Sequence, residues 1–271
     1  MKSVYNEKRY LNGDVEAIKH FEQIRKTYKE NIDKSLEDNK DIIKDYNIYL
    51  DYITEELLKY KLDTSVDYSI ALGYLINKGY LSEGLKFDSK ETDKEILGKP
   101  GISILQGSGC CRNICDMQKD IFERLKIDII PFYCYQGFDF KQGINKEANH
   151  IINLIEYNNN LYGIDLYNGC GLYHFRDSFT MKRISSNSDE LLRYKPYCEL
   201  IIDGRSLEQI KERIELFDSY SLLKPINSFV FEMIIRNEIE TLLYENRNEL
   251  NEFNNKTKIL RKNIVKKLDN I

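Results

Sequence analysis

The chain has no tryptophan, four prolines and three histidines among its 271 residues. Nowhere does it hold the run of about 18 apolar residues that a membrane-spanning helix requires, so no membrane partner is expected. Its first ten residues are polar and lack the apolar segment of a secretion signal. We therefore expect a soluble protein of the cytoplasm.

The composition also lacks a strong charge of either sign. The formal net charge is −4, from 40 basic and 44 acidic residues, so no overall field favours nucleic acid and no nucleic-acid partner is expected. The length suffices to bury a sizeable core. The abundance of lysine, asparagine, isoleucine and tyrosine is typical of a low-GC bacterium.

The six cysteines do not form a recognisable framework. Cys110 and Cys111 are adjacent, which suits a reducing compartment better than a set of disulfides. Cys110, Cys111 and Cys115 lack the paired C-x2-C spacing that identifies zinc sites. No metal and no cofactor is expected.

Three regions differ in pattern. Residues 1–99 are predicted to be helical: positions 14–61 contain neither glycine nor proline and show apolar spacings of three and four, which predict one long helix or two shorter ones. A short helix is expected at 65–78. Pro100 and Gly101 then mark the start of a new unit, 100–205, which is followed by a helical extension at 206–271.

The middle region, 100–205, has the pattern of an α+β core. Helical periodicity over 114–126 is followed by apolar runs at 127–135, 150–157, 161–166, 172–175 and 197–202, which predict strands. Residues 158–160 are three asparagines and predict a hairpin turn. One helix and a series of antiparallel strands indicate the α+β class.

The last region contains an apolar seam that approximates a heptad repeat. We expect this helix to pack on the long N-terminal helix; an exposed arm that binds a protein partner is the alternative. The seam consists of Ile239, Leu242, Leu250, Phe253, Leu260, Ile264 and Leu268.

A cysteine, a histidine and an aspartate follow one another in the order of a thiol-enzyme triad. Cys111 lies in Gly-Ser-Gly-Cys-Cys-Arg-Asn, where a helix begins, so the helix dipole would stabilise its thiolate and free backbone N–H groups could bind an oxyanion. Gly107 and Gly109 would allow a sharp turn and leave room for a substrate carbonyl. His150 could take the thiol proton, and Asp165 could orient the imidazole.

Several choices within this site remain open. Cys110 competes with Cys111, but we expect it to lie in the core; His174 is the alternative imidazole, and His20 is expected on the surface. Gln106 could donate to the oxyanion or serve as a plain turn residue. Arg112 and Asn113 are expected to brace the helix.

The strand register poses a further requirement. A hairpin centred on 158–160 places Asp165 opposite Asn153, three residues out of register with His150. A bulge would then be needed to bring His150 and Asp165 together.

The sequence resembles the transglutaminase-like superfamily over about residues 100–175. The matching segments are Gly-Cys-Cys-Arg-Asn at 109–113, Asn-His-Ile-Ile-Asn-Leu at 149–154 and Tyr-Gly-Ile-Asp-Leu-Tyr-Asn-Gly at 162–169. Two positions depart from the pattern: Ile152 replaces an aromatic residue and Leu166 replaces a proline. The resemblance implies a papain-like α+β core with catalytic residues Cys111, His150 and Asp165.

The same resemblance implies acyl transfer from a peptide or amide through a thioester, with a peptidase or amidase favoured and a peptide or protein as substrate. Transfer to an amine, as in protein cross-linking, stays open. So does an inactive module whose helical arms bind a partner. Arylamine N-acetyltransferases are similar in length and residue order, but their Arg-Gly-Gly-x-Cys signature is absent.

Overall fold

The computed structural model describes residues 9, 12–82, 86–87, 95–134, 150–157, 160–165, 171–174 and 228–271. Helices make up most of this part of the chain, and a four-stranded antiparallel sheet accounts for most of its strand residues. The strand expected at 197–202 lies outside the described residues.

The N-terminal pattern folds into two long helices, α2 (Val15–Asp38) and α3 (Lys40–Lys59), which are separated at Asn39. The Asp14 carboxylate begins α2 by accepting the N–H of Ala17 at 2.9 Å. A third helix, α4 (Ser65–Asn77), begins with a capping box between Thr64 and Asp67. The expected helices at 14–61 and 65–78 are thus confirmed.

The middle region starts with the 3-10 helix η2 (Pro100–Gln106) and the short strand β2 (Ser108–Gly109), which pairs in parallel with β1 (Lys86–Phe87). Helix α5 (Cys111–Leu125) follows, and its C-cap residue Lys126 adopts a left-handed conformation. This helix begins three residues before the apolar periodicity that predicted it. Its first turn therefore contains both Cys111 and Asn113.

The sheet has the order β3–β4–β5–β6, with every neighbouring pair antiparallel. Its strands coincide closely with four of the expected apolar runs, because alternating or continuous apolar residues between turn signals are what a sheet buries. They are β3 (Ile130–Cys134), β4 (His150–Tyr157), β5 (Asn160–Asp165) and β6 (Gly171–His174).

The C-terminal part forms α9 (Ser228–Glu245) and α10 (Arg247–Leu268). Helix α10 lies along α3, and the Lys267 Nζ bonds the Asp45 carboxylate at 2.6 Å. The seam residues Leu250, Ile264 and Leu268 are buried. The seam thus packs on the N-terminal helical region as expected, and its buried residues are not free for a partner.

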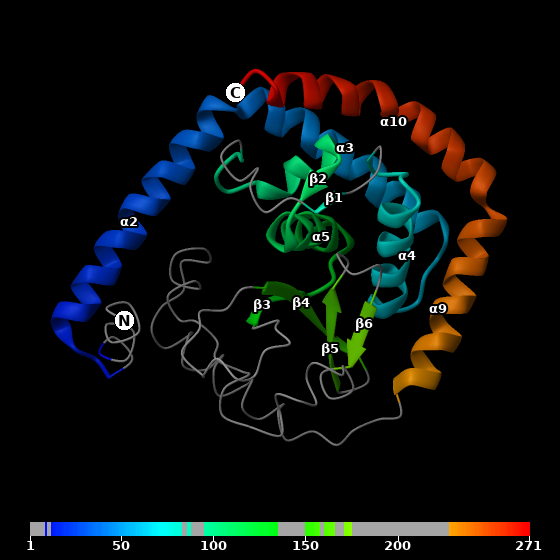
Figure 1. Cartoon of the computed structure of the whole chain (residues 1–271), viewed down its shortest axis with the longest axis horizontal. Coiled ribbons are helices and arrows are strands. Elements are labelled where there is room, and N and C mark those ends of the chain that lie inside the picture. The colour runs from blue at the N-terminus through cyan, green and yellow to red at the C-terminus, as the bar shows by residue number, and fades with distance from the viewer. Residues whose placement is uncertain are drawn as a thin grey trace.

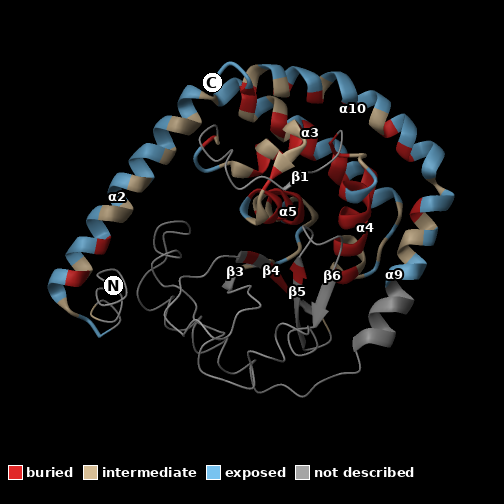
Figure 2. Cartoon of the chain, viewed as in Figure 1, coloured by how far each residue is buried: buried red, intermediate tan, exposed pale blue. Residues whose placement is uncertain are grey.

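The elements form successive layers (Figure 1). The sheet packs on α5, α3 covers α5 on the far side from the sheet, and α10 covers α3; α4 and α9 close one flank. Burial concentrates in α3, α4 and α5, whereas the outer faces of α2 and α10 are exposed (Figure 2). Because α5 is enclosed on most sides, even its polar residues Asn113, Gln118 and Asp120 are buried.

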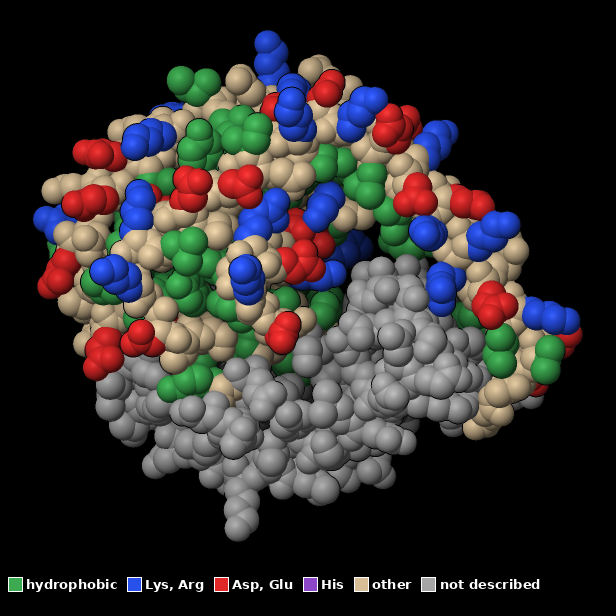
Figure 3. All heavy atoms as spheres, turned by 180° about the vertical axis from the view of Figure 1, so that it is seen from behind, with side chains coloured by type: hydrophobic (Ala, Val, Ile, Leu, Met, Phe, Trp, Pro, Cys, Tyr) green, Lys and Arg blue, Asp and Glu red, His purple; other side chains and the backbone are tan. Residues whose placement is uncertain are grey.

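Acidic and basic side chains are interspersed over the helices on the rear face, with small apolar patches between them (Figure 3). The electrostatic potentials of such interspersed opposite charges largely cancel at distances from the surface greater than a Debye length. None of the helices in the described ranges combines the length and apolarity needed to cross a lipid bilayer.

Candidate functional site

The backbone turn ahead of α5 is built on two glycines with different roles. Gly107 follows η2 as its C-cap residue with a φ of 81°, a conformation that favours glycine. A Cβ on Gly109 would lie 2.8 Å from Ile104 Cδ1 and 3.2 Å from Asn113 Cβ. The sharp turn is confirmed, but the space beside Gly109 is taken by the protein's own side chains.

Asn113, only 2% exposed, fixes the start of α5. Its Oδ1 accepts the N–H of Cys110 at 2.8 Å, while its Nδ2 donates to Glu95 Oε1 at 2.7 Å and to the Pro100 carbonyl at 2.8 Å. Arg112 adds an ion pair to Glu95 at 2.5 Å. The expected bracing role of Arg112 and Asn113 is confirmed, and it ties α5 to the 95–100 segment.

Cys110 is the N-cap residue of α5 and is partly exposed, so its expected place in the core was wrong. The reason is the helix start: a residue at the N-cap points its side chain back over the first turn instead of inward. A hydrogen bond from the Cys111 thiol lowers the pKa of Cys110 to about 6, helped by the backbone N–H groups of Arg112 and Asn113 and by the Arg112 charge.

Cys111 is the first helical residue and is also partly exposed. Its hydrogen bond to Cys110 raises its pKa, burial raises it further, and the backbone N–H of Ile151 acts in the opposite direction. The two thiols therefore titrate as a coupled pair, and the directions of the two pKa shifts favour ionisation at Cys110.

The first strand residues of β4 lie directly against this turn. The Ile151 N–H reaches the Cys111 thiol, and the Ile151 carbonyl accepts the buried Cys115 thiol at 3.2 Å, one helical turn further on. Asn153 Nδ2 donates to the Cys115 carbonyl and to Gln118 Oε1, both at 2.9 Å. These contacts fix β4 along the side of α5.

His150 precedes Ile151 and is the first residue of β4, paired with Cys134. The backbone of His150 therefore lies next in sequence to Ile151, whose N–H contacts the Cys111 thiol. His174 lies on β6, where it pairs with Tyr162 of β5, and Tyr162 in turn pairs with Ile155 of β4. His174 is thus two strands away from β4. His20 is exposed on α2, as expected. Of the three histidines, His150 is the one whose position adjoins the thiols.

The register of β4 and β5 differs by one residue from the expected one. Asn153 faces Ile164, because the hairpin has two residues between Tyr157 and Asn160, not three. Continued by one step, this register places Asp165 opposite Ile152, two residues from His150. Positions two apart share the same alternation of the sheet, so no bulge is needed to make positions 150 and 165 diagonal neighbours.

The alternation also sets a condition for any triad. The Asn153 side chain binds α5, which assigns the odd-numbered positions of β4 to the helix-facing side. Position 150 belongs to the other set. For its imidazole to reach Cys111, the first residue of β4 has to depart from the alternation of the strand.

Gln106 ends η2, and its Nε2 donates to Asp269 Oδ1 at 3.3 Å, at the end of α10. An oxyanion role for this amide stays a prediction. Within the described ranges, no three histidine, cysteine or acidic side chains gather in a metal-binding arrangement.

Two polar residues of this region escaped the sequence-based expectations. Cys115 follows Cys111 by four residues, a helical spacing that places both thiols on one face. Asn153 interrupts an otherwise apolar strand, and a buried amide in such a strand requires partners. Both signals were present in the sequence.

Comparison of the chain with protein-family models, with curated proteins and with solved structures found no match. The function has therefore to be inferred from the geometry of the thiol pair and its surroundings.

Proposed function

We propose that the protein carries out cysteine-dependent acyl transfer or hydrolysis on a peptide or amide, most simply as a peptidase or amidase with a papain-like α+β core. In this mechanism the Cys111 sulfur attacks the carbonyl carbon, the C–N bond breaks, and the leaving amine takes the proton that His150 removed from the thiol. The thioester is then cleaved by water, or by an amine. Asp165 orients the imidazole.

The thiol pair at the start of α5 is the observation that carries this proposal. The sulfur of Cys110 accepts two backbone N–H groups and the Cys111 thiol beside Arg112, which lowers the pKa of Cys110. The pKa of Cys111 is raised, so Cys111 needs a base to remove its proton before it attacks, and this is the role proposed for His150. The Cys111 thiol touches the backbone of the residue after His150. Partial exposure of both cysteines leaves them open to a substrate.

An oxyanion could bind at the same turn. The N–H of Cys111 lies at the first helical position, where no carbonyl of the helix can accept it. Backbone N–H groups at the N-terminus of a helix, the positive end of its dipole, stabilise a negative charge that develops on a substrate oxygen. Cys111 would thus supply both the attacking atom and one oxyanion donor.

Single-turnover acylation tests the proposal without a known substrate. The protein is mixed with p-nitrophenyl acetate, the release of p-nitrophenolate is followed, and the acetyl group is located by peptide mass spectrometry. We expect a burst of one equivalent, an acetyl thioester at Cys111, and loss of the burst in Cys111→Ala. His150→Ala should retain the burst in diminished form and slow deacylation.

His20→Ala is the matched control, because His20 is exposed on α2 and should leave both rates unchanged. An acetyl group on lysines alone, or equal turnover in Cys111→Ala, would contradict the proposal and favour a non-catalytic module. An acetyl group on Cys110 with none on Cys111 would reassign the nucleophile while retaining the reaction.

A further inference from the structure

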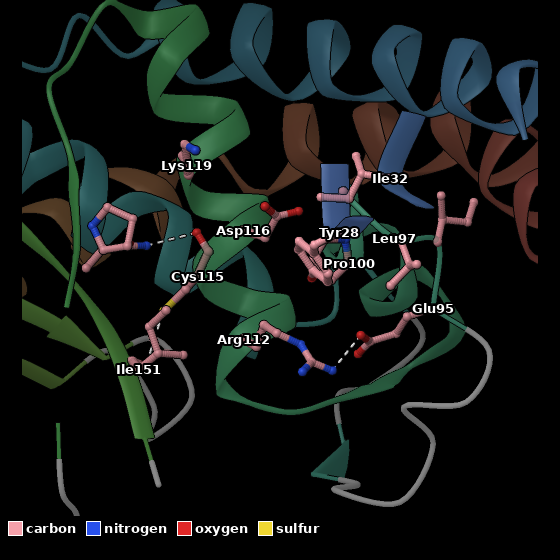
Figure 4. A pocket seen from close by; sticks show the side chains of 14 residues that line it. Tyr28, Ile32, Glu95, Leu97, Pro100, Arg112, Cys115, Asp116, Lys119 and Ile151 are labelled. Carbon is pink, nitrogen blue, oxygen red and sulfur yellow. Dashed lines mark hydrogen bonds and ion pairs between the residues drawn. The ribbon is translucent and has the colours of Figure 1, made fainter. Parts of the chain in front are cut away.

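A pocket of about 340 Å³ lies on the flank of α5, beside the thiol site (Figure 4). Four parts of the chain that are distant in sequence form its walls: α2, the 95–100 segment, α5 and the first strands of the sheet. Its volume lies within the range of small-molecule sites in proteins.

Most of the wall is apolar. Ile32 of α2, Leu97 and Pro100 of the adjoining segment, and Pro131 and Ile151 of the sheet all line it. Such a wall favours the hydrocarbon part of a ligand, since apolar area removed from water stabilises the complex by about 25 cal/mol per Å².

Two of the residues that line the pocket carry an oxygen with unused acceptor capacity, and the half-buried Asp116 is the one whose carboxylate a ligand can reach. Asn153 is fully buried, both of its Nδ2 hydrogens are donated, and its Oδ1 has no partner among the described residues. Asp116 accepts the Gly101 N–H through Oδ2 at 2.9 Å. In Figure 4 its carboxyl group extends from α5 toward Tyr28 and Pro100. Within the described residues the Gly101 N–H is the hydrogen-bond donor to this carboxylate, which leaves its other oxygen able to accept from a ligand.

The cations around the pocket do not fill this role. Arg112 is paired with Glu95, and its side chain is 43% exposed. Lys119 lies 4.0 Å from Glu123 and is 37% exposed. Neither forms an ion pair with Asp116 within the described part of the chain. Lys99 pairs with Asp120, and the charges of Lys99 and Lys119 act on Asp116 only from a distance. The Asp116 side of the pocket therefore presents a carboxylate that would repel an anion.

We propose that this pocket binds a small organic amine, with its ammonium group at the Asp116 carboxylate and its hydrocarbon part against the apolar wall. This site does not depend on the thiol chemistry proposed above, because no cysteine thiolate takes part in it. An ammonium supplies an opposite charge in direct contact with Asp116 and N–H donors for its carboxylate.

The pocket's electrostatics predict how this binding varies with pH. Burial, and next the charge of Asp120, raise the pKa of Asp116 to about 7. A bound ammonium favours the ionised carboxylate, so affinity is complete above pH 7 and falls as pH decreases through 7. The other charged or titratable groups around Asp116 are Arg112, Lys119 and Asp120 of α5, Glu95 and Lys99 of the adjoining segment, Tyr28 of α2 and Tyr46 of α3.

The test uses the full chain and three probes of the same shape: cyclohexylmethylamine, cyclohexylmethanol and cyclohexanecarboxylate. Binding is measured by NMR, from the shifts of isoleucine methyl groups assigned by substitution, which include Ile32 and Ile151 in the pocket wall. We expect the amine to bind at least about tenfold more tightly than the alcohol. From pH 8 to pH 6 its affinity should fall by about tenfold.

Two substitutions of opposite sign accompany the probes. Asp116→Asn retains an acceptor for Gly101 and should weaken amine binding at least about tenfold. Lys119→Gln, on a partly exposed side chain, should strengthen it by about two- to fivefold because a nearby like charge is removed. Glu55→Gln, on the exposed face of α3 and outside the pocket lining, is the matched control.

The outcomes are distinct. Equal affinity for amine and alcohol, tighter binding of the carboxylate, or no saturable shift at Ile32 and Ile151 would overturn the proposal. So would unchanged binding in Asp116→Asn when Lys119→Gln also has no effect. Because Cys111→Ala leaves this pocket intact, loss of acyl transfer and loss of amine binding can be told apart.

Discussion

The shared ionisation of Cys110 and Cys111 predicts an unusual pH profile for alkylation. With a pKa of about 6, Cys110 is about half thiolate at pH 6. An unperturbed thiol of pKa about 8.5 is then about 0.3% thiolate. The lower pKa also makes the Cys110 thiolate about tenfold less nucleophilic, from a Brønsted slope of about 0.4–0.5.

Together, these two effects predict that Cys110 reacts faster than an unfolded-chain thiol at low pH and more slowly at high pH. Cys110 should react with iodoacetamide about tenfold faster than the urea-unfolded chain at pH 6, and about tenfold more slowly at pH 9. Peptide mass spectrometry with fragmentation distinguishes Cys110 from Cys111 at each pH. Cys115, which is buried and bonded to the Ile151 carbonyl, should stay unmodified in the folded protein.

Two substitutions separate the causes. Cys111→Ala removes the hydrogen bond that most lowers the pKa of Cys110, so the midpoint of its alkylation should move upward. Cys111→Ser keeps a hydroxyl donor and should leave the midpoint closer to 6. A Cys110 midpoint at or above 8 in the intact protein, or a lower midpoint at Cys111 than at Cys110, would refute this reasoning.

Two further predictions concern stability and are checked by urea unfolding followed by circular dichroism. Asn153→Ala removes both hydrogen bonds from the Asn153 amide to α5 and should lower the free energy of unfolding by about 2–4 kcal/mol. A loss below about 0.5 kcal/mol would show that contacts other than these two hydrogen bonds fix β4 on α5. Gly101→Ala places a Cβ 2.6 Å from the Met117 backbone nitrogen, which cannot yield as a side chain does. It should cost at least about 3 kcal/mol, and more than Gly13→Ala, whose Cβ would meet no atom within 4 Å and whose strain comes from a φ of 79° alone.

Much of the helical and strand content could be predicted because apolar periodicity is a local property of the sequence. The seam from Leu250 to Leu268 gave the packing of α10, and the apolar runs gave β3 to β6. The β4–β5 register was one residue in error because three asparagines at 158–160 do not reveal that the last of them, Asn160, already belongs to the strand.

The site was harder to predict, since it depends on where α5 begins to within one residue. That single position decides whether Cys110 caps the helix or enters the core. The pocket beside Asp116 could not be predicted at all, because α2 and the 95–100 segment meet α5 only through tertiary packing. The sequence marks Asp116 as polar, and nothing local marks it as buried.

The packing of α10 on α3 has a consequence for how the protein is made. Asp45 on α3 and Lys267 on α10 are 222 positions apart in the sequence. When α3, α4 and α5 have left the ribosome during synthesis, the α10 residues that cover α3 have therefore not yet been made. During that interval the side of α3 that α10 contacts in the finished fold lacks its cover. Contacts of such long sequence separation form slowly, and exposed apolar surface promotes aggregation. The nascent chain is therefore expected to be a client of holding chaperones until α10 has emerged.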